Sequence, residues 1–444
     1  MEIAVQIAQL LVSLSLLVIC HEFGHFITAK IFKCRVDKFY LFFDPWFSLF
    51  KVKRGETEYG IGWLPLGGYV KIAGMIDESM DTEHLKHAPE PWEFRSKPAW
   101  QRLIVMLAGV IVNAILAMFI YAMVAFSWGS TYLSVNNMKY GVSVDSLAYT
   151  MGFRDGDMLK LVNGEPADNF SKVVIDVLLN DPRTITVSRN GVDTTVAFTD
   201  EMVAELLEGQ NAGLLFSPRF PFVVSGLPEG EPSAAAKAGF MAGDSVVSFN
   251  GKPCSFFNEV RRSLADNKGK EAEIGIVRNG RDSTITITIP DNGLIGVFTK
   301  SYHDYLTMST KEYGFFESFP VGISHGIDKI VEYCKQFKLI FNPDTKAYKS
   351  VGSFITMTKI FPVYWDWYAF WNLTALFSIM LAVVNVIPIP GLDGGHALFT
   401  LVEMISGKKP SEKFLEVSQT VGMVILILLM LLAIGNDFIR HVFN

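Results

Sequence analysis

Two histidines four residues apart, with a glutamate directly after the first, lie in the first apolar segment of this 444-residue chain: His21, Glu22 and His25. On a helix, side chains at positions i and i+4 share one face, so both imidazoles can reach the same metal ion. The pattern His-Glu-x-x-His supplies two zinc ligands and a general base. Zinc lowers the pKa of a coordinated water to about 7, and the glutamate can take the proton as the water attacks a carbonyl. The spacing predicts metal-assisted hydrolysis.

The apolar surroundings of this motif favour function over coincidence. An ionisable residue inside a membrane helix costs about 2.5–3.5 kcal/mol on insertion scales, and His21, Glu22 and His25 fall within little more than one turn. Two histidines satisfied by core packing would not need the glutamate, and a lipid-facing cluster is excluded by its cost. We therefore interpret the motif as a metal site.

A zinc hydrolase site usually has three protein ligands and one open position, so a third ligand is expected elsewhere. Asp393 is the candidate, in Asn385-Val-Ile-Pro-Ile-Pro-Gly-Leu-Asp-Gly-Gly-His396. The prolines break a helix there, which is tolerated at membrane depth only against protein or a wet cavity. About eighteen residues, or roughly 27 Å of helical rise, separate His21 from the outer face, and Asp393 follows the inner end of the third apolar segment. The two therefore meet near the cytoplasmic side, although Asp393 also fits a helix cap and His396 is a competing ligand.

Four apolar segments are long enough to cross a bilayer, which takes about 20 helical residues. They cover residues 3–32, 103–128, 367–386 and 417–442. The first segment lacks a basic start and a small-residue cleavage site, so we expect it to be retained and not removed as a signal peptide.

Composition supports a membrane protein with soluble parts. Half of the residues are hydrophobic and only 19% are charged. The net charge of −6 offers no basic stripe for a nucleic acid. The four scattered cysteines, which form no C-x-x-C pair, predict neither a disulfide framework nor a zinc knuckle.

Lysine and arginine in the short loops orient the chain, because cytoplasmic loops are enriched in both. The loop between the first two segments and the loop between the last two are basic, through Lys30, Lys33, Arg35, Lys38, Lys51, Lys53, Arg54, Arg95 and Lys97 in the first and Lys408, Lys409 and Lys413 in the second. Both loops are expected to be cytoplasmic. Both termini and the block from about residue 130 to 366 are then expected on the outer side.

The outer block contains an internal repeat. Gly152-Phe-Arg-Asp-Gly-Asp157 returns as Gly239-Phe-Met-Ala-Gly-Asp244, Asn163-Gly-Glu-Pro166 as Asn250-Gly-Lys-Pro253, and Arg189-Asn-Gly191 as Arg278-Asn-Gly280. Asn-Gly between β-rich runs is a hairpin signal. Each copy has the size of a small β-rich domain.

Taken in this order, the motifs resemble the site-2 protease family, and within it the bacterial branch of sigma E regulators with two PDZ domains. The resemblance covers nearly the whole chain. It rests on the His21–His25 motif, the stretch Pro65-Leu-Gly-Gly-Tyr-Val-Lys71, the paired repeat and the motif at residues 385–395. It implies a polytopic α-helical membrane protein with four transmembrane helices, two inserted β-rich PDZ-like domains and a membrane-associated β-hairpin.

The implied domains follow the chain in order. Residues 1–128 hold the first two transmembrane helices, with a hairpin at about 55–74. The two PDZ-like domains are residues 129–218 and residues 219–300. Residues 301–366 form amphipathic linker helices, and residues 367–444 hold the last two transmembrane helices. The linker shows helical apolar spacing mixed with lysines. It fits an interfacial helix on the outer membrane surface or a helix packing on the second PDZ-like domain.

Residue by residue, the family pattern makes His21, His25 and Asp393 the ligands of one zinc ion and Glu22 the base. A helical peptide bond hides its carbonyl, whereas a substrate added as a strand presents an extended bond. The residues implied to engage substrate are Asn385, Pro388 and Pro390, together with the edge strand Gly67, Gly68, Tyr69 and Val70.

Two stretches depart from the family pattern. Relatives usually show Gly-x-Gly where this chain has Leu41-Phe-Phe-Asp-Pro45, and Gly-Pro-x-x-Asn where it has Gly109-Val-Ile-Val-Asn113. Neither touches a ligand, so they concern the substrate cleft and the packing of the second helix. Asn113 needs a partner within the bundle, because an unsatisfied amide in lipid is costly.

The resemblance implies a zinc metalloendopeptidase of the bacterial inner membrane. It would cleave single-pass membrane proteins within the bilayer after a site-1 protease has trimmed them, with anti-sigma factors and remnant signal peptides as the implied substrate classes. The PDZ-like grooves would bind peptides or act as a size filter. A catalytically inactive PDZ scaffold would not need the intact ligands and base, and a metal or proton transporter would carry charges along several helices.

Overall fold

The computed structural model describes residues 2–65, 67–75, 88–208, 215–229, 233–350 and 352–442. Leu66 of the predicted edge segment and the terminal residues Met1 and Asn444 lie outside these ranges. The chain divides into two compact units. We call them the helical unit, Met1–Ser130, Glu312–Phe341 and Tyr348–Asn444, and the β-rich unit, Thr131–Lys311 and Asn342–Ala347.

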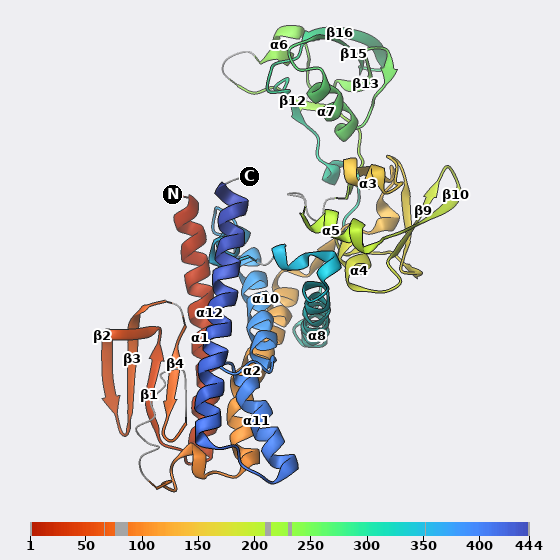
Figure 1. Ribbon diagram of the computed structural model, residues 1–444. Coiled ribbons are helices and arrows are strands. Elements are labelled where there is room, and N and C mark those ends of the chain that lie inside the picture. The colour runs from red at the N-terminus through yellow and green to blue at the C-terminus, as the bar shows by residue number, and fades with distance from the viewer. Residues whose placement is uncertain are drawn as a thin grey trace. The chain divides into compact units, whose positions relative to one another are not determined.

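The helical unit contains, in the described residues, four helices long and apolar enough to cross a membrane. They are α1 (Glu2–Ile31), α2 (Ala99–Trp128), α10 (Trp367–Val386) and α12 (Glu412–Val442). This confirms the four predicted apolar segments. Helix α2 packs against both α1 and α10, and the start of α1 and the end of α12 lie at the same end of the unit (Figure 1).

Small residues let α1 and α2 approach closely. A β-carbon on Gly24 of α1 would lie only 2.6 Å from the backbone oxygen of Ala108 in α2. Across the bundle, the Ser378 hydroxyl of α10 donates to the backbone oxygen of Asn113 in α2 at 2.7 Å. Without a hydrophobic driving force between helices in lipid, such close contacts and hydrogen bonds hold a bundle together.

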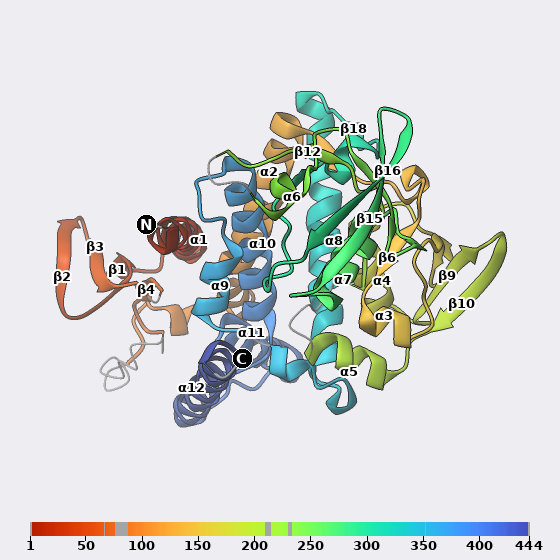
Figure 2. The same ribbon diagram turned by 90° about the horizontal axis from the view of Figure 1, so that it is seen from above.

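The segment after α1 folds into a four-stranded sheet, in the order β2-β3-β1-β4. The strands are β1 (Val36–Leu41), β2 (Phe43–Arg54), β3 (Thr57–Leu64) and β4 (Tyr69–Ile72). The sheet lies beside α1 (Figures 1 and 2). A hairpin is present after α1, but β2 and β3 form it at residues 43–64. The predicted bounds of about 55–74 are wrong, because β3 and β4 do not pair with each other.

Strand β1 separates them. It pairs in parallel with β3 and antiparallel with β4. The side chains of Val36 and Tyr40 in β1 are almost fully buried. This burial fits the place of β1 inside the sheet, between β3 and β4. The short strand β4 is left at the edge of the sheet, as predicted for this stretch.

Helix α8 (Phe315–Ile340) covers α2. A β-carbon on Gly322 would overlap the backbone nitrogen of Ala122, and one on Gly326 would lie 2.7 Å from Cγ of Met118. The apolar spacing thus correctly predicts a helix, but its partner is α2, which neither alternative named. The short helix α9 (Phe354–Ile360) and helix α11 (Asp393–Ser406) complete the helical unit.

The β-rich unit repeats one arrangement twice. The sheet order β10-β9-β7-β8 is matched by β16-β15-β13-β14. The strands are β7 (Met158–Val162), β8 (Glu165–Pro166), β9 (Thr184–Arg189) and β10 (Val192–Ala197), and β13 (Ser245–Phe249), β14 (Lys252–Pro253), β15 (Glu271–Arg278) and β16 (Arg281–Thr288). The duplication is therefore structural, while the PDZ assignment stays a prediction.

Shorter elements surround these sheets. They are β5 (Ser130–Tyr132), β6 (Val142–Val144), α3 (Ser146–Thr150), α4 (Val173–Leu179), α5 (Asp200–Glu208), β11 (Phe216–Pro218), β12 (Val224–Gly226), α6 (Ala234–Ala238), α7 (Phe257–Asp266), β17 (Phe298–Thr299) and β18 (Ser309–Lys311).

One buried ion pair explains two of the repeated motifs. Asp157 accepts hydrogen bonds from Arg189 at 2.8 and 2.7 Å, and Asp244 accepts them from Arg278 at 2.7 Å twice. The Gly-Asp and Arg-Asn-Gly motifs of each copy are thus the two halves of one contact. Burial raises the pKa of Asp244, but the Arg278 bonds and a bond from the Met241 backbone outweigh it and lower that pKa.

Candidate metal centre

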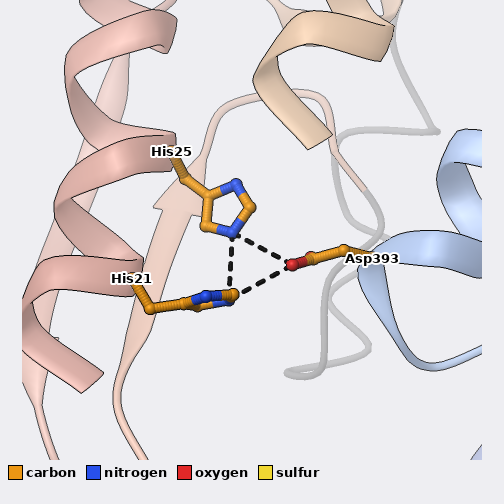
Figure 3. A group of neighbouring side chains, drawn as sticks. All are labelled: His21, His25 and Asp393. Atoms are coloured by element: carbon orange, nitrogen blue, oxygen red, sulfur yellow. Dashed lines mark hydrogen bonds and ion pairs between the residues drawn. The ribbon is translucent and has the colours of Figure 1, made fainter. Parts of the chain in front are cut away.

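Three side chains from two distant elements converge at one point (Figure 3). His21 and His25 project from the same face of α1, and Asp393 reaches them from the first residue of α11. Oδ2 of Asp393 lies 3.2 Å from Nε2 of His21 and 3.3 Å from Nε2 of His25, and the two Nε2 atoms are 3.3 Å apart. The three predicted ligands are therefore brought together.

The donor set and its spacing fit a zinc ion. Zinc takes imidazole nitrogen and carboxylate oxygen at about 2.0–2.2 Å, so two ligands at a tetrahedral centre lie about 3.3 Å apart. The three measured separations match that value. Oδ2 of Asp393 is also buried and has no hydrogen bond with any described residue, although it lies beside two imidazoles. A cation between the three atoms accounts for this buried oxygen.

Contacts of the Nδ1 atoms orient both imidazoles so that their Nε2 atoms face Asp393. Nδ1 of His25 lies 2.8 Å from the backbone oxygen of Val105, so it donates there and leaves Nε2 for a metal. Nδ1 of His21 lies 3.2 Å from the side-chain amide of Asn113, whose Oδ1 has no other described partner. With the Asn113 amide turned over, its Oδ1 accepts a hydrogen bond from Nδ1 of His21. Asn113 thus finds the partner that the sequence required.

Gly109 of α2 makes room for the two histidines. A β-carbon at this position would overlap Nε2 of His25 and lie 2.7 Å from Cε1 of His21. In the sequence, Gly109 stands out only as part of a motif that lacks the family's proline. Its contact could not be found from spacing alone, because it joins helices about 85 residues apart in the chain, a separation that no helical periodicity reports.

The three side chains lie in the wall of a cavity of about 660 Å³. Of the other residues predicted for the site, Glu22, Gly68, Tyr69, Val70 and Asn385 also line it. Gly67, Pro388 and Pro390 do not. Lys71, the last residue of the predicted edge stretch, lines the cavity as well, and so do three polar residues that were not predicted for the site, namely Lys38, Asp44 and Gln419.

Glu22 and strand β4 meet within this cavity. The Glu22 carboxylate interacts with the backbone amide of Val70 in β4. The ideal β-carbon of Gly68 would lie 3.4 Å from Cγ of Glu22 and 2.7 Å from the backbone oxygen of Tyr40, so only glycine fits there. The unpaired edge of β4 therefore faces the predicted base.

Tyr69 is held firmly at this edge. Its ring stacks on Tyr40, at 5.3 Å, and on Phe43, at 6.0 Å, and its hydroxyl donates to Asp44 at 2.8 Å. Burial raises the pKa of Tyr69, and the Asp44 carboxylate raises it further, so the hydroxyl stays protonated and donates.

Asp44 lies within the stretch that replaces the family's Gly-x-Gly. Phe42 and Trp46 on either side of it have positive φ values of 67° and 71°, which non-glycine residues rarely adopt. The pairing of β2 with β3 shifts register here, between Phe43 and Ser48. The departure is therefore a bulge that aims Asp44 at Tyr69, and such strain is typical of functional sites.

The proline-rich turn positions Asp393. A β-carbon on Gly394 would overlap the backbone oxygen of Val386, and one on Gly395 would lie 2.5 Å from that of Ile389. The two glycines therefore let α11 start directly against the end of α10. Asp393 is the first helical residue of α11, and the N-cap position before it is Leu392, whose side chain makes no capping hydrogen bond. His396 lines the cavity but is not among the three residues whose ligand atoms converge.

Comparison with known proteins supports the same family as the sequence motifs. Residues 9–429 match Peptidase family M50. The chain is 30% identical to the regulator of sigma-E protease RseP of Salmonella typhimurium, over 98% of both chains, and 30% identical to that of Escherichia coli, also over 98% of both. It is 28% identical to a putative zinc metalloprotease of Neisseria meningitidis, over 96% of this chain and 97% of the relative.

Proposed function

This chain belongs to peptidase family M50, the metalloproteases of the site-2 protease class, and on that premise we propose that it cleaves membrane-spanning substrates inside the bilayer at a single zinc ion. His21, His25 and Asp393 would hold the zinc, and Glu22 would act as the base. The relatives named zinc metalloproteases support the choice of metal.

The observation that carries this proposal is the convergence of the three ligand atoms, 3.2–3.3 Å apart, beside Glu22 and the free edge of β4. Two of the ligands and the base sit on a helix apolar enough to span a membrane. Ionisable residues at such a place are by default functional.

The chain's residues divide the chemistry among them. A bound zinc ion supplies Lewis acidity, which acidifies water and polarises a carbonyl. Glu22 accepts the proton of the attacking water on its carboxylate and returns it to the leaving amine. Gly68 and the first two residues of β4, Tyr69 and Val70, pair with the substrate and hold the scissile bond extended. Asn385, whose amide lies 3.4 Å from Nε2 of His21, binds the substrate beside the metal.

The proposed substrates are single-pass membrane proteins that another protease has already shortened. The relatives' names connect them with regulation of sigma E, which supports an anti-sigma factor as one substrate class. Remnant signal peptides are a second proposed substrate class, because they too are single membrane-spanning segments with a short outer end. The location is the bacterial inner membrane, with the active site near the cytoplasmic face and the termini and the β-rich unit outside.

The β-rich unit is proposed to control access. Two PDZ-like modules outside the membrane would exclude substrates that still carry a bulky outer domain, or bind the new end of a trimmed one. A purely scaffolding function is not favoured, because a scaffold would not need Glu22 or the convergent ligands.

The test compares the wild-type protein with Glu22→Gln in detergent, using a tagged single-pass substrate. We expect the variant to keep its zinc, measured by metal analysis, and to lose cleavage by at least about a hundredfold, as general-base removal typically causes. Metal-dependent cleavage by Glu22→Gln at the wild-type rate would exclude this mechanism.

A further inference from the structure

Two polar side chains of helix α12 are buried among its described residues, Gln419 and Asp437. Gln419 is only 3% exposed, whereas Val421 is 51% exposed and Thr420 is also exposed. Most of the helix is similarly open and apolar. A buried glutamine on such a helix requires an explanation, because polar residues within membrane segments are costly and are retained for a purpose.

Gly422 fixes where Gln419 lies. A β-carbon at Gly422 would overlap the backbone oxygen of Pro390, and one on Gly391 would lie 3.5 Å from the backbone nitrogen of Met423. The backbone of α12 therefore rests directly on the proline-rich turn that precedes Asp393. Gln419 lies three residues before Gly422, on the same helical face, and reaches the wall of the active-site cavity with Asn385 and Asp393.

The Gln419 amide has no hydrogen bond with any residue that the structure describes. Other buried amides of the helical unit do have partners: Gln6 donates to the backbone oxygen of Phe361 at 2.6 Å, and Gln9 to that of Pro362 at 2.8 Å. A glutamine amide offers two donor hydrogens and an acceptor oxygen, and the Gln419 side chain borders the cavity, where a bound molecule can pair with it. The partner of Gln419 is therefore expected from outside the chain.

An unwound substrate supplies such a partner. When a membrane helix is pulled into an extended strand, its backbone N–H and C=O groups lose their helical partners, and each needs a new one where water is scarce. Strand β4 can pair with only one edge of the extended substrate. The other edge still presents unpaired peptide groups. Gln419 of α12 lines the cavity, as Tyr69 and Val70 of β4 do, and α12 and β4 lie apart in Figure 2.

We propose that Gln419 is a substrate-binding residue, whose side-chain amide hydrogen-bonds a backbone peptide group on the substrate edge that β4 leaves unpaired. This inference rests on the proposed function. A carboxamide carries a donor and an acceptor, as a peptide group does, so it would bind the substrate backbone independently of sequence.

The test replaces Gln419 with methionine, which has a similar length and no hydrogen-bonding amide. Thr420→Val is the matched control, because it removes a polar group from the next position on the same helix. Each protein is given a synthetic single-pass peptide in detergent micelles, and a series of the same peptide in which one backbone amide at a time near the cut is replaced by an ester. An ester removes one N–H donor and weakens one acceptor.

We expect Gln419→Met to raise KM about tenfold, as the loss of one good hydrogen bond predicts, with kcat changed less than about twofold and zinc content equal to wild type. At one ester position the wild-type protein and Thr420→Val should lose about the same tenfold, and Gln419→Met should lose nothing more. Wild-type parameters for Gln419→Met on every peptide would overturn the proposal.

Loss of zinc or of folded protein in Gln419→Met would also overturn it, because Gln419 would then support the fold. Gln419→Asn, which keeps the amide on a shorter side chain, should lie between Gln419→Met and wild type in KM. If the wild-type protein itself fails to cut any peptide, the proposed function fails. If it cuts and the Gln419 variants match it, only this inference fails.

Discussion

Asp393 is the residue on which the account of the metal site depends most. It closes the triangle of ligand atoms, and its Oδ2 has no hydrogen bond within the described part of the chain. His396, one turn later on α11, lies in the wall of the same cavity without joining the triangle.

Replacing each of these two residues with alanine separates their roles. Asp393→Ala should lower bound zinc to well under half of the wild-type content, because it removes one of three protein ligands. His396→Ala should keep its zinc. Metal analysis of the purified proteins measures both, and the reverse pattern would transfer the ligand role to His396.

At the same scale, the sequence was sufficient for the proposed ligands and base and insufficient for the residues that support them. The spacing of His21, Glu22 and His25 is typical of a zinc site, and the broken third apolar segment, together with the family resemblance, adds Asp393. Gln419 could not, because a lone glutamine carries no pattern. Its position at the cavity depends on a contact between Gly422 and Pro390, residues that no local periodicity relates.

Among the elements, the contact of α1 with α2 is the one that holds the histidines in place. Gly109 is the closest point of that contact. Gly109→Ala should displace both imidazoles, and overpacking of about 1–3 kcal/mol corresponds to a roughly 5- to 150-fold loss of zinc affinity.

Gly435→Ala in α12 is the control, because nothing in the described structure lies within 4 Å of a β-carbon there. Competition with a fluorescent zinc chelator measures both affinities. Equal zinc binding by the two variants would mean that the close packing of α2 does not set the ligand geometry.

The Asp244–Arg278 ion pair makes the second β-rich module sensitive to acid. Because the pKa of Asp244 is lowered in the folded state, the carboxylate stabilises the module at neutral pH, and this contribution is lost as the pH falls below about 4. Arg278→Gln should therefore lower the hydrogen-exchange protection of β13 and β15 at pH 7, and the difference from wild type should shrink toward pH 3.

Arg189→Gln provides the matched change in the first module and should leave the second one protected. A difference between Arg278→Gln and wild type that stays constant from pH 7 to pH 3 would mean that the charge of Asp244 does not stabilise the fold.

Strand elements were harder to predict than helices. The four apolar helices are confirmed. They were predictable because a run of about 20 apolar residues is typical of a membrane-spanning helix. The resemblance to the family implies a hairpin beside α1, whereas the structure has a four-stranded sheet there. Its true order places β1 between β3 and β4, and this depends on the burial of Val36 and Tyr40, which adjacent sequence does not reveal.

On the scale of the whole molecule, the chain combines a helical unit that contains the candidate metal centre with a β-rich unit, most of which is inserted between α2 and α8. The family prediction from the sequence is confirmed over residues 9–429. The duplicated β arrangement is confirmed as well, because turn glycines and the Asp–Arg pair leave a clear repeat in the sequence. The function of that unit stays a prediction, because shape alone does not tell a filter from a peptide-binding site.

The position of the cut tests the central claim most directly. A single-pass substrate with a short outer segment is incubated with the protein in liposomes, and the masses of the products locate the broken bond. We predict a cut within the apolar segment, toward its cytoplasmic end, that disappears with Glu22→Gln. A cut confined to residues outside the bilayer, or an intramembrane cut that Glu22→Gln makes equally well, would contradict the account.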